Sequence, residues 1–202
     1  MTSKLISQKL EDGFMLVIQP LIDLMISWRV HPHTVTVIGL LFSIFSGYQF
    51  YLGNFVWGGV LLILSGICDV LDGKLARTAN LATKYGALFD SSMDRFAEIF
   101  VFMGLVAYYD EALIDALLIL TLGGSLMTSY VRARAEGLGI SCKVGIMQRP
   151  ERLTYLSAGA IFSFLWNGTM ILAIIFVAVF SNVTAIQRIA HTYKKTNEIV
   201  SK

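Results

Sequence analysis

The sequence predicts an all-α integral membrane protein, with six transmembrane helices preceded by an N-terminal amphipathic helix at the membrane interface. Of its 202 residues, 55% are hydrophobic and only 15% are charged, whereas soluble domains carry about a quarter charged residues. The apolar residues also gather in runs near the roughly 20 residues that a spanning helix needs. Six spans are expected, at 35–53, 55–71, 86–108, 112–131, 153–166 and 169–186.

The segment before the first run, 1–30, predicts a juxtamembrane helix. Its apolar residues recur three or four positions apart, as in Leu10, Phe14 and Ile18, which is typical of an amphipathic helix. Such a helix lies in the membrane interface or, alternatively, covers the end of the bundle as a short soluble helix. No cleavable signal peptide is evident. We expect a single domain over 1–202, with the six-helix bundle at 31–192.

The basic residues predict the orientation of these spans. All 16 lysines and arginines fall at the two termini or in the second–third and fourth–fifth connections, apart from Arg95 near the basic end of the third span. The opposite connections, around 53–55, 109–111 and 166–168, contain none. Because basic loops stay in the cytoplasm, we expect a cell-membrane protein with both termini and the basic face cytoplasmic.

Four aspartates form the candidate active site. Asp69 and Asp72 lie three residues apart at the end of the second expected span, and Asp90 and Asp94 lie four apart at the start of the third. Each pair therefore shares one helix face, and the two spans are expected to be antiparallel neighbours whose aspartates meet. Close carboxylates need compensating positive charge, and all-oxygen ligands suit Mg²⁺, Mn²⁺ or Ca²⁺. The alternative is a set of helix-end aspartates facing water.

Small residues and an arginine beside the aspartates indicate a phosphate-bearing ligand. Gly73, Ala76 and Gly86 let a flat ligand approach the backbone, although small residues also favour tight helix packing. Arg77 offers a planar fork that matches phosphate oxygens, or else extends to the interface. A divalent-cation transporter would use the same carboxylates, but it would not require these four residues at their spacing.

One motif resembles the signature of the CDP-alcohol phosphotransferases (class I CDP-alcohol phosphatidyltransferases) in every position: Asp69-x2-Asp72-Gly73-x2-Ala76-Arg77-x8-Gly86-x3-Asp90-x3-Asp94. The resemblance implies an enzyme of phospholipid biosynthesis that acts on a CDP-diacylglycerol-type lipid, exchanges CMP for an alcohol and forms a homodimer. It implies two divalent metal ions that are held by all four aspartates, with Mg²⁺ as the expected metal and Mn²⁺ as the alternative. Asp94 is also implied as the general base. No nucleic-acid partner is expected.

The resemblance also implies which residues bind the CDP-linked lipid. These residues are the small and basic members of the motif, the residue three positions before Gly86, and a segment preceding the first span. They are Pro32, His33, Thr34, Val35, Thr36, Gly73, Ala76, Arg77, Thr83 and Gly86. His33 stands where the family often has Asn or Asp.

Three arginines near the ends of different spans predict an anion pocket for the acceptor. They are Arg132, Arg152 and Arg188, and the alternative is ordinary positive charge on the cytoplasmic side. Nearby, Arg134 and Glu136 are expected to pair and brace the pocket. Acceptors without phosphate, such as serine or free inositol, would leave these arginines without a ligand.

The stretches around these arginines narrow the expected acceptor. Ser-Tyr-Val-Arg-Ala-Arg-Ala-Glu, Arg-Pro-Glu-Arg-Leu and Gln-Arg resemble stretches of the phosphatidylinositol-phosphate synthases of bacteria and their archaeal counterparts. This resemblance implies that the three arginines bind the phosphate of inositol 1-phosphate. Phosphatidylglycerophosphate synthases share the aspartate signature, so glycerol 3-phosphate is the alternative acceptor.

Overall fold

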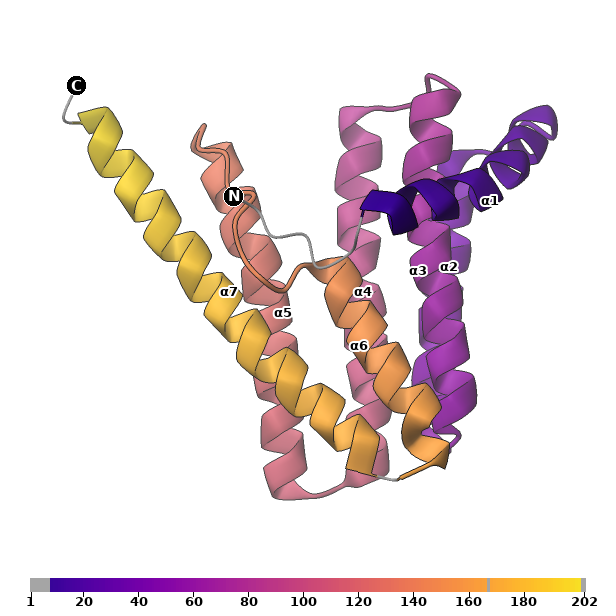
Figure 1. Ribbon diagram of the computed structural model, residues 1–202, viewed down its shortest axis with the longest axis vertical. Helices are drawn as coiled ribbons and strands as arrows, with labels where there is room; N and C mark the ends of the chain where they lie inside the picture. The colour runs from indigo at the N-terminus through magenta and orange to yellow at the C-terminus, as the bar shows by residue number, and fades with distance from the viewer. Residues whose placement is uncertain (1–7, 167, 201–202) are drawn as a thin grey trace.

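The computed structural model describes residues 8–166 and 168–200, and this part of the chain is helical without any strand (Figure 1). Seven α-helices and one 3-10 turn follow one another: α1 (Gln8–Ser27), α2 (Pro32–Tyr51), α3 (Phe55–Thr78), α4 (Lys84–Tyr109), α5 (Ala112–Gly137), α6 (Arg149–Ile161), η1 (Phe162–Phe164) and α7 (Gly168–Val200). The first seven residues of the expected N-terminal helix lie outside the described part.

Four of these helices are long and apolar enough to cross a membrane, namely α2, α3, α5 and α7, so the chain is a multi-pass membrane protein. The other two expected spans correspond to α4 and α6. Helix α4 has 26 residues, but Asp94, Arg95 and Glu98 interrupt its apolar sequence near the middle. Helix α6 has 13 residues, so the expected span at 153–166 is completed by η1.

The helices pack in two groups, which are joined by α6 and by a contact between α4 and α5. Helix α2 lies against both α3 and α4, α5 lies against α7, and α6 contacts α3 and α7 (Figure 1). The α2–α4 contact depends on Gly47 and Gly104, since a Cβ added to either would collide with the backbone of the facing helix. Glycine is needed where two helix backbones approach this closely.

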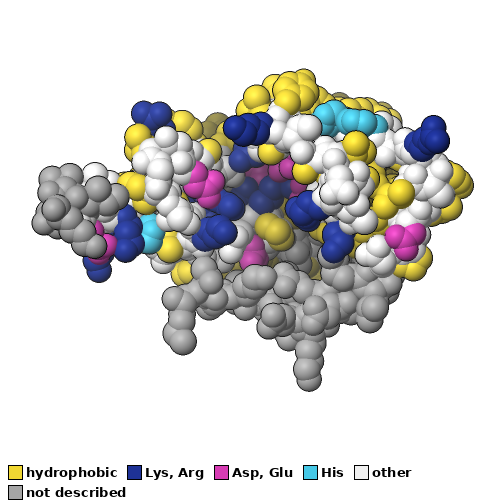
Figure 2. Space-filling view, turned by 90° about the horizontal axis from the view of Figure 1, so that it is seen from above, with side chains coloured by type: hydrophobic (Ala, Val, Ile, Leu, Met, Phe, Trp, Pro, Cys, Tyr) yellow, Lys and Arg dark blue, Asp and Glu magenta, His cyan; other side chains and the backbone are white. Residues whose placement is uncertain are grey.

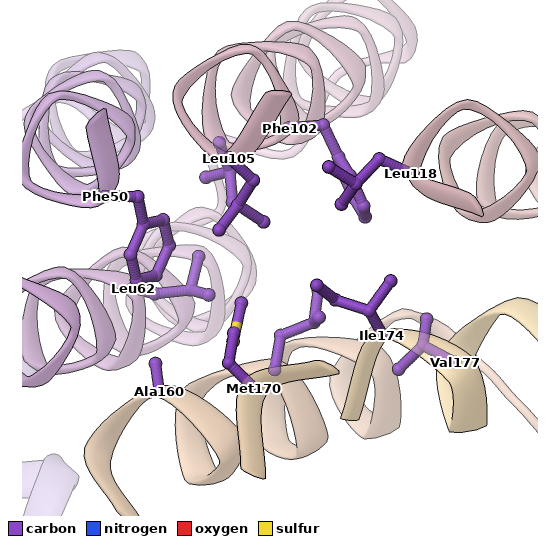
Figure 3. Close-up of a cluster of buried hydrophobic side chains, with 11 residues drawn as sticks. Phe50, Leu62, Phe102, Leu105, Leu118, Ala160, Met170, Ile174 and Val177 are labelled. Carbon is purple, nitrogen blue, oxygen red and sulfur yellow. The ribbon is translucent and has the colours of Figure 1, made fainter. Parts of the chain in front are cut away.

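A buried apolar cluster fills the half of the bundle away from the aspartates. Side chains from α2 to α7 contribute to it (Figure 3). Its labelled members are Phe50, Leu62, Phe102, Leu105, Leu118, Ala160, Met170, Ile174 and Val177. A second, smaller cluster attaches α1 to the bundle: Ile18 and Ile22 pack with Val35, Leu71 and Leu75.

Buried hydroxyl groups join α2 to α3 at three levels. Ser46 donates to the Gly58 carbonyl at 2.7 Å, and the hydroxyls of Ser43 and Ser65 are 2.7 Å apart. At the third level the Thr36 hydroxyl donates to the carboxylate of Asp72. Buried polar groups need hydrogen-bond partners, so this ladder fixes how α2 and α3 align and places the site relative to α2.

Candidate active site

Three of the four predicted aspartates converge at one point. One carboxylate oxygen from each of Asp69, Asp72 and Asp90 lies within 4.8 Å of the others. The first two come from α3 and the third from α4. The two helices bring their aspartates together as predicted, but each packs mainly on α2 and not on the other. The aspartates therefore face one another across a space bordered by α2, which leaves room for a ligand between them.

The carboxylate cluster has the features expected of a divalent metal site. Thr36 donates its hydroxyl hydrogen to Asp72 Oδ2 at 2.6 Å, and such outer contacts orient metal ligands. Asp90 Oδ1 is buried and has no hydrogen-bond partner among the described residues. An unpartnered buried carboxylate oxygen is costly, and a hard divalent cation coordinated by Asp69, Asp72 and Asp90 would satisfy it. The residues therefore fit a divalent metal ion.

Asp94 lies beside this cluster and has different partners. Arg149 places Nη2 2.6 Å from Asp94 Oδ1 and Nη1 2.7 Å from Asp69 Oδ2. Arg95 is a more distant partner, with Nη1 3.9 Å from Asp94 Oδ2. The sequence analysis did not assign Arg149 a role. Its proximity in sequence to Arg152, a predicted acceptor residue, was the available signal. No local pattern indicates that Arg149 pairs with residues 55 and 80 positions earlier.

A cavity of about 170 Å³ opens next to the aspartates. Its walls come from the start of α2, the end of α3, the start of α4 and the connection between α3 and α4. Eight of the lining residues were predicted to bind the CDP-linked lipid: Pro32, His33, Thr36, Gly73, Ala76, Arg77, Thr83 and Gly86. Two aspartates, Asp72 and Asp90, also line the cavity. Three further lining residues, Leu81, Ala82 and Ala87, were not predicted from the sequence.

The two glycines keep this cavity open. A Cβ on Gly73 would lie 3.7 Å from both terminal nitrogens of Arg77, and one on Gly86 would lie 3.3 Å from the His33 ring. Thr83 caps α4 by accepting a hydrogen bond from the Gly86 N–H at 2.9 Å. At these two glycines the wall is backbone, and the Arg77 guanidinium group also lines the cavity, which suits a phosphate-bearing ligand.

Two of the predicted donor-binding residues lie away from the cavity wall. Thr34 is exposed, and Val35 is buried in the cluster that holds α1. His33 itself packs beside aromatic rings, 5.0 Å from Phe89 and 6.0 Å from Tyr85 between centroids. Successive residues of a helix point in different directions, so the five-residue segment 32–36 cannot face one ligand throughout.

The predicted acceptor arginines lie on three different helices and make different contacts. Arg152 is buried, with Nη2 2.5 Å from Glu98 Oε1. Arg188 is also buried and donates from Nη1 to the Thr128 carbonyl at 2.6 Å. Arg132 lies nearer the surface, where it pairs with Glu136 at 3.0 Å.

The Arg132–Glu136 contact corrects the expected pairing of Arg134 with Glu136. Residues four apart share a helix face, whereas residues two apart do not. Seen from above, Lys and Arg side chains surround a hollow at whose floor acidic side chains also gather (Figure 2). Arg132 and Arg152 both lie within electrostatic range of Arg188, so the three arginines share one region.

The match to known proteins agrees with the aspartate motif and its geometry. The model of the CDP-alcohol phosphatidyltransferase family matches residues 29–186. The chain belongs to the CDP-alcohol phosphatidyltransferase family. The resemblance predicted from the aspartate signature is thereby confirmed, and the chain is an enzyme of the CDP-alcohol phosphotransferase class.

Relatives within the CDP-alcohol phosphatidyltransferases carry specific names. The archaetidylinositol phosphate synthase of Methanothermobacter thermautotrophicus is 38% identical over 162 residues, which cover 80% of this chain and 82% of that one. The phosphatidylinositol phosphate synthase of Mycobacteroides abscessus is 35% identical over 158 residues, which cover 75% of this chain and 71% of that one.

Solved structures of a further CDP-alcohol phosphatidyltransferase share this fold. The phosphatidylinositol phosphate synthase of Mycobacterium tuberculosis with CDP-DAG bound superposes with a TM-score of 0.79 at 27% identity, covering 86% of this chain and 92% of that one. The same enzyme in complex with manganese and citrate gives a TM-score of 0.79 at 28% identity, covering 86% and 88%.

Proposed function

We propose that this chain transfers the phosphatidyl or archaetidyl group from a CDP-linked lipid to a hydroxyl of inositol 1-phosphate and releases CMP. The observation that carries the proposal is the cavity of about 170 Å³ that places Arg77 and two open glycine positions beside Asp72 and Asp90. Relatives named archaetidylinositol and phosphatidylinositol phosphate synthases support the same reaction.

The proposed donor site is the cavity between α2, α3 and α4. Gly73 and Gly86 let the diphosphate approach the backbone, and Arg77 binds its oxygens through a planar fork of N–H groups. The apolar outer faces of these helices leave the lipid chains in the bilayer. The CDP-DAG bound to the Mycobacterium tuberculosis enzyme supports this class of donor.

Asp69, Asp72 and Asp90 are the proposed ligands of two Mg²⁺ ions, with Asp94 contributing to the set and Mn²⁺ as a possible substitute. Bound there, the metal would stabilise negative charge on the diphosphate as its P–O–P bond breaks, with one phosphate staying on the lipid and the other leaving in CMP. Thr36 holds Asp72 in place. Asp94 accepts the proton of the acceptor hydroxyl, because an alcohol is a poor nucleophile until a base removes its proton.

The proposed acceptor site contains Arg132, Arg152 and Arg188. Arg152 Nε is buried without a hydrogen-bond partner among the described residues, which leaves a donor for a phosphate oxygen. Arg152 and Arg188 are held by Glu98 and by backbone carbonyls, so their guanidinium groups are placed before the acceptor arrives. Preorganised arginines of this kind suit a phosphorylated polyol.

In the membrane, we propose six spans within one domain, with α4 and α6–η1 added to the four apolar helices. The exposed apolar residues Leu21, Leu24 and Trp28 support an interfacial position for α1, where aromatic side chains are favoured. The absence of basic residues from the opposite connections supports cytoplasmic termini and a cytoplasmic active site. We further propose a homodimer, as the family resemblance implies.

The proposed reaction is tested with radiolabelled CDP-lipid and purified protein. Inositol 1-phosphate, glycerol 3-phosphate, free inositol and serine are offered separately, in diacyl and diether lipid, with Mg²⁺ or with a chelator. Product is expected only with inositol 1-phosphate and only with metal. Product with glycerol 3-phosphate alone would contradict the proposed acceptor, and metal flux into liposomes without any lipid product would support a transporter instead.

A further inference from the structure

Arg149 connects three helices at the centre of the site. It is the first residue of α6, and α6 begins inside the bundle, below the upper end of α5 (Figure 1). Its side chain is only 15% exposed, and its two terminal nitrogens reach carboxylates on α3 and on α4. The adjacent Gln148 N–H is held at 3.1 Å by Glu151 Oε2, so the first turn of α6 is fixed in place.

The same guanidinium group contacts two carboxylates, of which only one belongs to the cluster that fits a metal ion. Asp69 belongs to the three-residue set that fits a metal ion, whereas Asp94 lies outside that set. A cation bound by Asp69, Asp72 and Asp90 would lie close to the Arg149 charge, because Arg149 Nη1 is 2.7 Å from Asp69 Oδ2. Like charges at such short range in a poorly solvated site repel strongly.

We propose that Arg149 is a positioning residue that serves as the internal counter-ion of the aspartates and competes with the divalent metal for Asp69. When the metal binds, Arg149 releases Asp69 and retains Asp94. The carboxylates are thus kept together before the metal arrives, and Asp94 stays oriented throughout. This inference rests on the metal site proposed above.

Removal of Arg149 should change the affinity for metal in a direction that depends on the role of this residue. If Arg149 competes with the metal, its removal tightens metal binding, and we expect Arg149→Met to lower the Kd for Mn²⁺ about tenfold, the effect of about 1.4 kcal/mol. If Arg149 only holds the ligands from outside, its removal instead weakens binding by about 10- to 100-fold, as the loss of an outer contact does.

The experiment titrates the purified full-length protein with Mn²⁺ and measures free Mn²⁺ by electron paramagnetic resonance, without any turnover. Arg149→Met is compared with the wild type and with Arg149→Lys, which keeps the charge but cannot reach both carboxylates. Arg149→Lys is expected to show a smaller tightening. Arg134→Met removes an exposed arginine and serves as the matched control, with a Kd within about twofold of the wild type.

Thermal unfolding with and without Mn²⁺ separates this role from simple packing. Arg149→Met should lower the Tm more in chelator than in saturating Mn²⁺, since the metal then replaces the missing positive charge. An equal loss in both conditions, or an unchanged or weakened Mn²⁺ affinity in both Arg149 variants, would overturn the inference. A wild type that binds no Mn²⁺ would contradict the proposed metal site itself. If Arg149→Met does not fold, the Arg149→Lys titration decides.

Discussion

Asp94 differs from the other three aspartates in its contacts. The others supply the carboxylate oxygens that lie within 4.8 Å of one another, whereas Asp94 lies outside that set and shares Arg149 with Asp69. Its position on α4 places it one turn beyond Asp90 and one turn before Glu98, which binds Arg152. Asp94 thus lies between the carboxylate cluster and the proposed acceptor arginines, where a base for the acceptor hydroxyl is required.

Replacement of Asp94 by Asn should separate binding from turnover. The amide keeps the size of the side chain but cannot accept the hydroxyl proton, so kcat should fall by about 10²- to 10⁴-fold. Binding of the CDP-linked lipid should stay within about twofold, because the cavity that we assign to it does not include Asp94. CMP release and equilibrium binding measure the two effects, with Asp110→Asn on an exposed connection as the control. Turnover near the wild-type rate would refute the base assignment.

At the scale of elements, α7 holds the connection that leads into α6. Thr184 accepts hydrogen bonds from the Ile146 and Met147 N–H groups at 3.2 and 2.9 Å, and Arg188 donates from Nε to the Val144 carbonyl at 2.8 Å. Gly145 lies between these contacts with a φ of +119°, where a side chain would be strained. The position of α6, and of the arginines at its start, therefore depends on α7.

Loss of the Thr184 hydroxyl should misplace the acceptor site more than the donor site. Thr184→Val leaves two backbone N–H groups without their acceptor, which costs about 1–3 kcal/mol of stability where the groups are buried. We expect KM for the acceptor to rise several-fold while KM for the CDP-linked lipid stays within about twofold. Thr184→Ser should restore both values, and the exposed Thr196→Val is the control. Equal changes in the two KM values would argue against this role.

At the glycine contact between α2 and α4, replacement of glycine by alanine should lower the stability of the protein. Alanine normally favours a helix over glycine by about 1 kcal/mol. Gly104→Ala should nevertheless lower the Tm by several degrees, because its Cβ collides with the Gly47 backbone and overpacking costs about 1–3 kcal/mol. Gly123→Ala on α5 has open space around its Cβ and should leave the Tm unchanged or raise it. A Gly104→Ala variant as stable as Gly123→Ala would contradict the packing.

For the whole molecule, helix length supports the proposed membrane placement. The 33 residues of α7 span about 50 Å at 1.5 Å per residue, which exceeds the roughly 30 Å hydrocarbon core. Its last turns, with Lys194 and Lys195, therefore extend beyond the bilayer on the side of the α3–α4 connection (Figure 1). The active site lies towards this same side, where a soluble acceptor can enter from water.

Cysteine labelling tests the orientation of the whole chain. Glu111 and Lys194 are exposed positions near opposite ends of the bundle, whereas the native Cys68 and Cys142 are buried. In a background with both native cysteines replaced by alanine, a membrane-impermeant maleimide should label Glu111→Cys in intact cells. It should label Lys194→Cys only after permeabilisation. The reverse pattern would invert the proposed topology.

Relations within one helix, or across one short connection, could be predicted from the sequence. The pairing of Asp69 with Asp72 and of Asp90 with Asp94 follows from helical spacing. The cavity lining from 73 to 86 was also predictable because its residues lie close in the chain. Composition was sufficient for the helical membrane class, since the bilayer requires internally satisfied backbone groups.

The tertiary structure alone decided which charged groups meet. Arg149 could have paired with several carboxylates, but the entry of α6 into the bundle brings it to Asp69 and Asp94. The packing of α2 against both α3 and α4, with Gly47 and Gly104 at its contact with α4, sets the space in which the aspartates face one another. Helical periodicity relates residues three or four apart, whereas contacts across 50 to 80 residues depend on how whole helix surfaces fit together.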